Sequence, residues 1–182
     1  RSERFLTGVG PMSDAGVLGC LLAQFPHSFQ YTPAAVEFLR RLAEHFAGQR
    51  LVAEFRHVSW ATSEAWRELP PLGIGFCNVD EPALKGLMPA TAEVTSDVAY
   101  FRFHGRNASK WFRHQEASER YNYLYDREEL KPWVERIKRT AAKAEKAFVF
   151  MNNHPLGHAV TNAQMLMEML GLEPAPEDGA WF

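Results

Sequence analysis

The sequence has few of the features that would assign it to a specialised class of protein. Its two cysteines, Cys20 and Cys77, lie in apolar stretches without C-x-x-C spacing, so we expect buried thiols rather than a disulfide or a metal site. No apolar run reaches the ~18 residues of a membrane-spanning helix. The formal net charge of −2 implies no obligatory nucleic-acid or membrane partner.

Motifs of common catalytic classes are also missing. No H-x-H or H-E-x-x-H pair is present, and His154 and His158 are separated by a Pro-Gly turn rather than by one turn of helix. No G-x-S-x-G occurs, and Ser59 and Ser109 fall in loops or at helix starts, which argues against a serine nucleophile. No pattern identifies a cofactor, so the cofactor is unknown at this stage.

The 182 residues, 46% of them hydrophobic, are enough for one substantial core, so we expect a single domain over residues 1–182. The first residue is Arg1, and the opening RSERFLTGVGPM reads as if the chain begins inside a helix. No signal peptide is visible, but a targeting segment could precede such a start, so a cytoplasmic location is a default and not an inference.

Hydrophobic periodicity predicts five strands that alternate with helices. Thr32 is the expected N-cap of one helix, and Asp126 with Glu129 has the spacing of a capping box at the start of another. Strand–helix alternation favours a parallel sheet, either open and doubly wound or part of a (β/α)8 barrel. The predicted strands are Leu18–Phe25, Leu51–Arg56, Ile74–Val79, Ala99–His104 and Ala147–Asn152; the predicted helices are Arg4–Ala15, 33–47, Ser63–Leu69, 127–143 and His158–Leu170, followed by an irregular tail over 172–182.

Polar side chains gather at the carboxyl end of each predicted strand. In a parallel α/β protein this is where ligands bind, so we expect the groups to converge on a pocket. The alternative is that the charged groups neutralise one another as a buried ion network, which explains one or two strands better than five. The residues concerned are Gln24, Glu54, Arg56, Asn78, Asp80, Arg102, His104 and Asn152.

The stretch FVFMNNHPLGHAVTNA, residues 148–163, ends the last strand on amides and an imidazole. We expect Asn152 to face the pocket, and Asn153 and His154 to begin the loop above it. Pro155 and Gly157 would then shape a turn into a helix whose N-terminal amides suit an anion. For Asn153, a turn that satisfies its own backbone is an equal alternative.

Several longer segments carry a family resemblance. LVAEFRHVSW, VAYFRFHGRN, YNYLYDREELKPW and FVFMNNHPLGHAVTNAQMLMEML occur in the order found in the YecE-like family, a domain of unknown function with the number 72, which the chain resembles from LGCLLAQFPHSF to its last helix. The family is similar to TIM barrels and has no established reaction. In YNYLYD, Asn122 stands where the family pattern leads us to expect an acidic residue.

The resemblance further implies a truncated, partial TIM-type barrel. The five strands would be strands four to eight, and only the C-terminal portion of the family would be present, with a partial site. Such a fragment would leave raw sheet edges at Leu18–Phe25 and Ala147–Asn152, through which we expect self-association.

The expected pocket suits acid–base chemistry on a small anion. Arg56, Arg102 and Arg106 supply planar guanidinium groups for a carboxylate or phosphate. Glu54, Asp80 and His104 are the candidate acid or base groups of a hydrolase, isomerase or lyase. The amides expected to bind a hydroxyl-rich or sugar-like substrate are Gln24, Asn78, Asn107 and Asn152, with Asn153 and His154 in the adjoining loop.

Two other functions remain open from the sequence. The Glu, Asp and His side chains at successive strand ends could hold a divalent metal in a hydrolase or isomerase. The stretch 102–139 interleaves basic residues with aromatics such as Trp111, Phe112 and Tyr121, a pattern of single-stranded nucleic-acid grooves. Carboxylates share that stretch, so a solvated helix beside an aromatic loop is the simpler interpretation.

Overall fold

The computed structural model describes residues 2–173, so the predicted irregular tail lies outside the described residues beyond Glu173. The helices are α1 (Ser2–Asp14), α2 (Pro33–His45), α3 (Ser63–Arg67), α4 (Arg127–Ala141) and α5 (His158–Leu170). The strands are β1 (Leu21–Gln24), β2 (Leu51–Glu54), β3 (Ile74–Asp80), β4 (Val98–Phe103) and β5 (Lys146–Met151), and the short 3-10 turns are η1 (Val58–Trp60), η2 (Pro70–Leu72), η3 (Ala108–Lys110), η4 (Ala117–Tyr121) and η5 (Pro155–Gly157).

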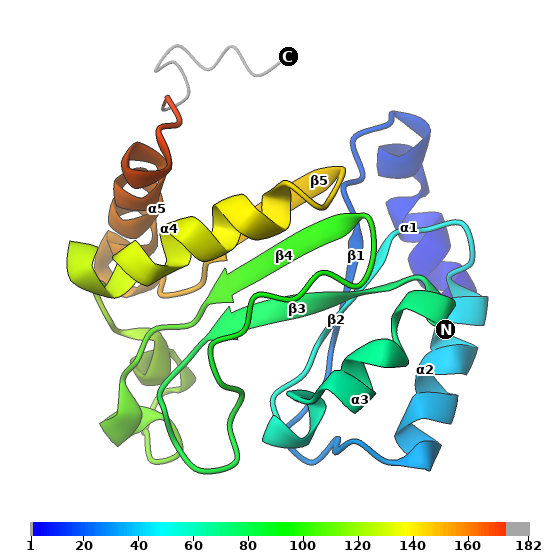
Figure 1. Ribbon diagram of the computed structural model, residues 1–182, viewed down its shortest axis with the longest axis horizontal. Helices are drawn as coiled ribbons and strands as arrows, with labels where there is room; N and C mark the ends of the chain where they lie inside the picture. Colours follow the sequence, from blue (N-terminus) through cyan, green and yellow to red (C-terminus); the bar gives the residue numbers. More distant parts are fainter. Residues whose placement is uncertain (1, 174–182) are drawn as a thin grey trace.

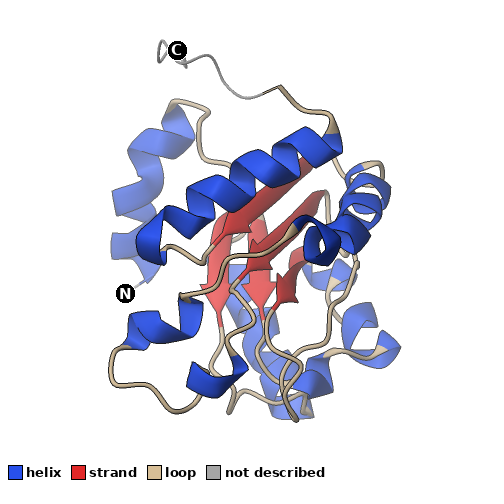
Figure 2. Ribbon diagram, turned by 90° about the vertical axis from the view of Figure 1, so that its left-hand side faces the viewer, coloured by secondary structure: helices blue, strands red, loops and turns tan. Residues whose placement is uncertain are grey.

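The five strands form one parallel sheet in chain order, β1-β2-β3-β4-β5. The sheet curls into a half-barrel, and the helices lie along its outer side (Figures 1 and 2). The predicted α/β class and parallel pairing are therefore confirmed. No described helix is long and apolar enough to cross a bilayer.

The predicted helix boundaries rest on capping groups that form as expected. The Thr32 side chain accepts a hydrogen bond from the Ala35 amide at the start of α2. Asp126 and Glu129 make both hydrogen bonds of a capping box at the start of α4. Gly171 ends α5 in the left-handed conformation that glycine adopts without steric cost.

The two faces of the sheet are distinguished by strand register. Neighbouring residues in a parallel register point to the same face, so Phe76 lies on the face of Ala53, while Arg102 lies on that of Val79. Phe101 and Phe103 pack edge-on against Trp133 of α4, which identifies their face as the outer, helix-covered one. The opposite, inner face of the half-barrel carries Glu54, Arg102 and Phe150.

The inner face changes from apolar to polar along the strands. Val52 and Val79 are buried on it, and Tyr100 stacks at 5.3 Å on Phe150 of the neighbouring strand. Beyond these residues, at the carboxyl ends, come the charged side chains of the candidate site. The sheet has two outermost strands, β1 and β5, and Phe150 on β5 is 47% exposed.

Candidate functional site

Glu54 is the centre of a charged cluster on the inner face. It ends β2, and its side chain is completely buried. Gln24, at the end of β1, donates to both of its carboxylate oxygens at 3.3 Å. Arg102 of β4 donates from Nη1 to Oε2 at 2.5 Å, and Arg56 donates from Nη2 to Oε1 at 3.4 Å. Side chains of β1, of β4 and of the segment after β2 therefore donate to one carboxylate.

His104 and Asn152 complete this cluster. His104, which follows β4, places Nε2 at 3.3 Å from Glu54 Oε1 and is 1% exposed. A carboxylate oxygen accepts, so Nε2 carries the proton and Nδ1 accepts from the Asn152 amide at 3.2 Å. The Asn152 oxygen in turn accepts from Arg102 Nη2 at 3.0 Å. The end of β5 is thus tied to the end of β4 through side chains predicted for the pocket.

The electrostatics of the cluster favour an ionised Glu54 beside a neutral His104. Burial alone would raise the pKa of Glu54, but the hydrogen bonds from His104 and Arg102 and the charge of Arg102 outweigh it and lower the pKa to about 2. Burial lowers the pKa of His104, and the neighbouring arginines act in the same direction, while Glu54 opposes them. The hydrogen bonds from His104 and Arg102, together with the positive charge of Arg102, therefore keep Glu54 ionised.

A cavity of about 400 Å³ lies beside this cluster and reaches it through Arg56. Arg56 is 23% exposed and makes one long contact with Glu54, so its guanidinium has donors to spare. Burial lowers the pKa of the nearby His57, with the charge of His27 as a second cause. The cavity is lined by Pro26, His27, Arg56, Glu81, Leu87, Trp111, Phe112, His114 and Arg120.

Glu81 is a pocket residue that the sequence reasoning missed. It directly follows β3, is 9% exposed, and accepts a hydrogen bond from the Met88 amide at 2.9 Å on Oε1. Desolvation by burial raises its pKa to about 8. The available signal was parity: Glu81 is two residues beyond Val79, which lies on the inner face.

A second buried carboxylate, Asp80, lies on the outer face of the sheet. Arg106 forms two hydrogen bonds with it, from Nε at 2.8 Å and from Nη2 at 2.6 Å. Tyr125 donates to Oδ1 and Trp133 to Oδ2, each at 2.7 Å. These four bonds occupy both oxygens, and α4 covers the group through Trp133.

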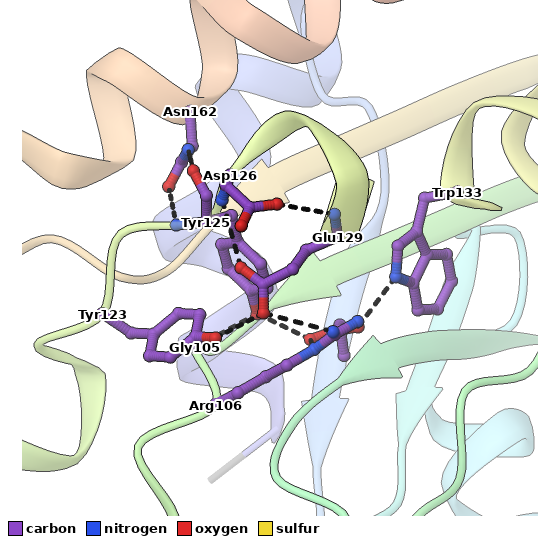
Figure 3. Close-up of polar contacts among 9 residues, drawn as sticks. Gly105, Arg106, Tyr123, Tyr125, Asp126, Glu129, Trp133 and Asn162 are labelled. Carbon is purple, nitrogen blue, oxygen red and sulfur yellow. Dashed lines mark hydrogen bonds and ion pairs between the residues drawn. The ribbon is translucent and has the colours of Figure 1, made fainter. Parts of the chain in front are cut away.

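The network around Asp80 extends along the segment that leads into α4. Tyr125 accepts from the Gly105 amide at 2.8 Å and so fixes the turn after β4. Glu129 accepts a short hydrogen bond from the Tyr123 hydroxyl and contacts Arg106 at 3.4 Å (Figure 3). Burial and Asp80 raise the pKa of Tyr125, while hydrogen bonds to Asp80 raise that of Arg106. These groups act as a brace between the sheet and α4.

The expectation that all strand-end groups converge on one pocket is therefore wrong for β3. Asn78 and Asp80 face the helices, because the register puts them on the side of Phe76 and away from Glu54. Asn78 is fully buried and bonds to Thr91, to both backbone groups of Glu93, and to the Tyr100 carbonyl. The buried-ion-network alternative describes the outer face well.

Three other residues that were predicted to bind substrate also lie outside the inner cluster. Asn153 is fully buried and donates to the Tyr123 carbonyl and to Asn162 Oδ1, each at 2.8 Å, so it satisfies neither its own turn nor the pocket. Asn107 donates to the Glu119 carbonyl at 3.0 Å within the loop 105–126. His154 is exposed and lies 5.7 Å, ring to ring, from Tyr121.

The basic, aromatic stretch 102–139 is divided among several surroundings. Arg102 belongs to the inner cluster and Arg106 to the outer network. Trp111 is buried beside the cavity, whereas Phe112 is 62% exposed at its rim. Arg136 lies over the ring of Trp133 at 4.8 Å. The stretch does not form one continuous groove of cations and rings.

Metal-ligand groups do not cluster in the part of the chain that the structure describes. Across residues 2–173 no three His, Cys, Asp or Glu side chains are arranged to hold an ion. The two cysteines are free, as predicted, with Cys77 buried and Cys20 partly exposed. The cavity is lined by two arginines, Arg56 and Arg120, and by a single acidic side chain, Glu81.

These features define an α/β half-barrel with a charged cluster and a pocket at the carboxyl ends of its parallel strands. The model of the family described as "Protein of unknown function DUF72" matches residues 1–180, and the chain belongs to this family. The family resemblance drawn from the sequence motifs is confirmed, and the match covers nearly the whole chain.

Relatives from three bacteria support this assignment. The UPF0759 protein YunF of Bacillus subtilis is 26% identical over 181 residues, which are 94% of this chain and 64% of that protein. A DUF72 family protein of Thermotoga maritima has a solved structure with a TM-score of 0.88, 42% identity and coverage of 93% and 64% of the two chains. One from Enterococcus faecalis gives a TM-score of 0.87 at 26% identity, with coverage of 96% and 66%. The chain thus spans about two thirds of the length of these relatives.

Proposed function

We propose that this chain binds a small anionic, phosphate- or carboxylate-bearing molecule at the carboxyl ends of its strands, as part of an enzyme that uses acid–base chemistry. One observation carries the proposal: the buried Glu54 cluster opens through Arg56 into the cavity of about 400 Å³. A buried carboxylate that holds two arginines in fixed positions prepares those arginines for an anion.

The roles within the cluster follow from hydrogen bonding. Glu54 accepts from four side chains and has a pKa of about 2, so it is suited to orient cations and poorly suited to take up a proton at neutral pH. His104 has both ring nitrogens engaged and acts as a spacer between Glu54 and Asn152. Arg56 is the anion-binding group, and Arg102 supports it electrostatically.

The walls of the cavity suit a ligand with an apolar or ring-shaped part. Trp111 and Phe112 contribute rings, and Leu87 adds an aliphatic surface. Sugars and similar hydroxylated molecules have apolar and polar parts, and a pocket that has both aromatic rings and hydrogen-bonding groups can contact both. The substrate class that fits best is therefore a small anion with a compact carbon skeleton, such as a sugar acid or sugar phosphate.

The proposal includes the larger architecture. We infer that the five strands correspond to strands four to eight of a TIM-type barrel and belong to the C-terminal portion of the family's full length. The parallel order, the curl of the sheet and the two-thirds coverage of the relatives support this inference. Groups from further strands would then complete the pocket.

A thermal-shift experiment with a matched pair of arginine variants tests the proposal. The ligands are sulfate, a sugar monophosphate, a dicarboxylate and a short single-stranded oligonucleotide. Arg56→Met removes the cavity arginine, whereas Arg50→Met removes an arginine that precedes the same strand and pairs with Asp97 at 2.6 Å and Glu145 at 2.7 Å.

We expect at least one small anion to stabilise the wild type and Arg50→Met, but not Arg56→Met. At 100 times its dissociation constant a ligand stabilises by about 2.7 kcal/mol. Stabilisation by the oligonucleotide alone, with a steep salt dependence, would favour nucleic-acid binding instead. A flat result with every small anion would contradict the proposal.

A further inference from the structure

Glu81 occupies a distinctive position in the pocket. Glu81 comes two residues after Val79, so it continues the alternation that places every second residue of β3 on the inner face. The Met88 amide donates a hydrogen bond to its Oε1 at 2.9 Å. Its second oxygen, Oε2, accepts no hydrogen bond from the described residues, and the residue lines the cavity together with Arg56 and Trp111. A buried carboxyl group with one oxygen held by the backbone thus lines the space for a ligand.

The charges around Glu81 explain its protonation. Burial is the main cause that raises its pKa to about 8, and the charges of Glu54 and Asp80 add to it. The Met88 amide and Arg56 oppose the rise without cancelling it. The charged and titratable groups that line the cavity with Glu81, from the loops after β1, β2 and β4, are His27, Arg56, His114 and Arg120.

We propose that Glu81 enters the binding event as a neutral acid and donates its carboxyl proton in a hydrogen bond to the anion held by Arg56. The inference rests on the proposed function, because it concerns the same pocket. An anion accepts from both an arginine and a carboxylic acid, whereas an ionised Glu81 would repel it. Anion binding is therefore linked to the protonation of this one side chain.

The same placement makes Glu81 the candidate general acid. In a proton transfer, the Glu81 O–H bond breaks and an O–H bond forms at an oxygen of the substrate, while the electron pair of the broken bond stays on the Glu81 carboxylate. The negative charge that remains on Glu81 lies in the same cavity as Arg56, which stabilises it. This group supplies the mobile proton that Glu54 and His104, held by their neighbours, do not.

The test measures the affinity for inorganic sulfate by calorimetry between pH 6 and pH 9.5, since sulfate does not titrate in this range. For the wild type we expect constant affinity at low pH and a fall of about tenfold per pH unit above pH 8. Glu81→Gln keeps an acceptor for Met88 and a donor for the anion, so the fall in affinity above pH 8 should be absent from this variant. Comparison with this variant removes the contribution of every other titrating group.

The possible results separate this inference from the proposed function. Sulfate binding that depends on Arg56 but shows the same pH profile in wild type and Glu81→Gln would overturn the role of Glu81 alone. An absence of sulfate binding at every pH would overturn both. If Glu81→Gln does not fold, carboxyl ¹³C NMR of the wild type decides: a glutamate that titrates near pH 8 and shifts with sulfate supports the inference, and titration of all glutamates below pH 6 overturns it.

Discussion

The two faces of this sheet carry two buried carboxylates that look alike in the sequence and differ in their surroundings. Asp80, on the outer face, is held by Arg106, Tyr125 and Trp133 at 2.6 to 2.8 Å and lies under α4. Glu54, on the inner face, is held by longer and more varied contacts of 2.5 to 3.4 Å next to a cavity. Each carboxylate has an arginine partner, but only Glu54 has a partner, Arg56, that lines the cavity.

The difference shows how position decides the role of a charged residue. A carboxylate that aromatic donors enclose links elements together, and every one of its lone pairs is used within the protein. A carboxylate that arginines surround at the edge of a cavity positions their positive charge for a ligand in that cavity. We infer that the outer network is structural and the inner cluster functional, and the following variants separate the two.

The largest effect is expected on the outer face. Asp80→Asn keeps the shape but replaces one acceptor oxygen by a donor, leaves Arg106 without its counter-ion and removes an acceptor from Tyr125 or Trp133. Loss of one partner of a buried pair costs about 3–5 kcal/mol. Urea unfolding measures this loss, and at pH 6, well below the pKa of Glu81, sulfate affinity of the folded variant should not change. A loss below about 1 kcal/mol would mean that the network is not structural.

Removal of the inner carboxylate should cost less stability and more binding. Glu54→Gln weakens hydrogen bonds that are 3.3 Å or longer except for the one from Arg102, so we expect a loss of about 1.5–3 kcal/mol. Sulfate affinity should also change, because Arg56 and Arg102 lose the group that orients them. Unchanged affinity in a folded Glu54→Gln protein would contradict the functional role of the inner cluster.

Acid unfolding sharpens the same comparison. The pKa of Glu54 is about 2 in the folded protein and 4.5 in its ordinary state, so the folded state favours the ionised form. Its contribution to stability is present above pH 4.5 and is lost as pH falls toward 2. The stability gap between wild type and Glu54→Gln should therefore close over that range. A gap of constant size from pH 6 to pH 2.5 would argue against an ionised Glu54.

Two adjacent asparagines offer a matched pair of intermediate effect. Asn153→Ala removes buried hydrogen bonds to Tyr123 and Asn162, and we expect it to cost about 1–3 kcal/mol without altering sulfate affinity. Asn152→Ala removes the side chain that fixes Arg102 and His104, so it should cost less stability and weaken sulfate binding. Urea unfolding and calorimetry of both variants measure the contrast. The reverse pattern would mean that the two faces have been assigned incorrectly.

The smallest expected effect concerns the sheet edge. Phe150 is 47% exposed on β5, an outermost strand, and such edges pair with other chains. We predict that the 182-residue chain self-associates and that Phe150→Glu reduces this association, because a charge on an edge strand opposes pairing. Sedimentation velocity measures the distribution. A wild-type chain that stays monomeric at high concentration would contradict this expectation.

Much of the fold was predictable because its signals are local. Strand–helix alternation gave the parallel class, and the capping residues Thr32, Asp126 and Glu129 gave helix starts that the structure reproduces. The inner cluster was also within reach, because strand ends of a parallel sheet meet at one edge and parity groups Glu54 with Arg56 and Arg102 with His104.

The role of β3 was not predictable from its own residues. Asn78 and Asp80 share one parity and Glu81 the other, and only the register with neighbouring strands says which set faces the cavity. A signal did exist in the donors Tyr125 and Trp133, since a buried ring with a polar tip needs an acceptor. Pairing such donors with Asp80 across 45 and 53 residues requires the tertiary fold.

One measurement tests the division of the two faces most directly: calorimetric titration of sulfate into wild type, Arg56→Met and Arg106→Met, below the unfolding temperature of each. The two arginines both follow strand ends and both pair with a buried carboxylate, but on opposite faces of the sheet. We predict that Arg56→Met abolishes binding and that Arg106→Met retains wild-type affinity despite lower stability. Equal affinity in all three proteins, or loss of binding in Arg106→Met alone, would contradict the assignment of the pocket to the inner face.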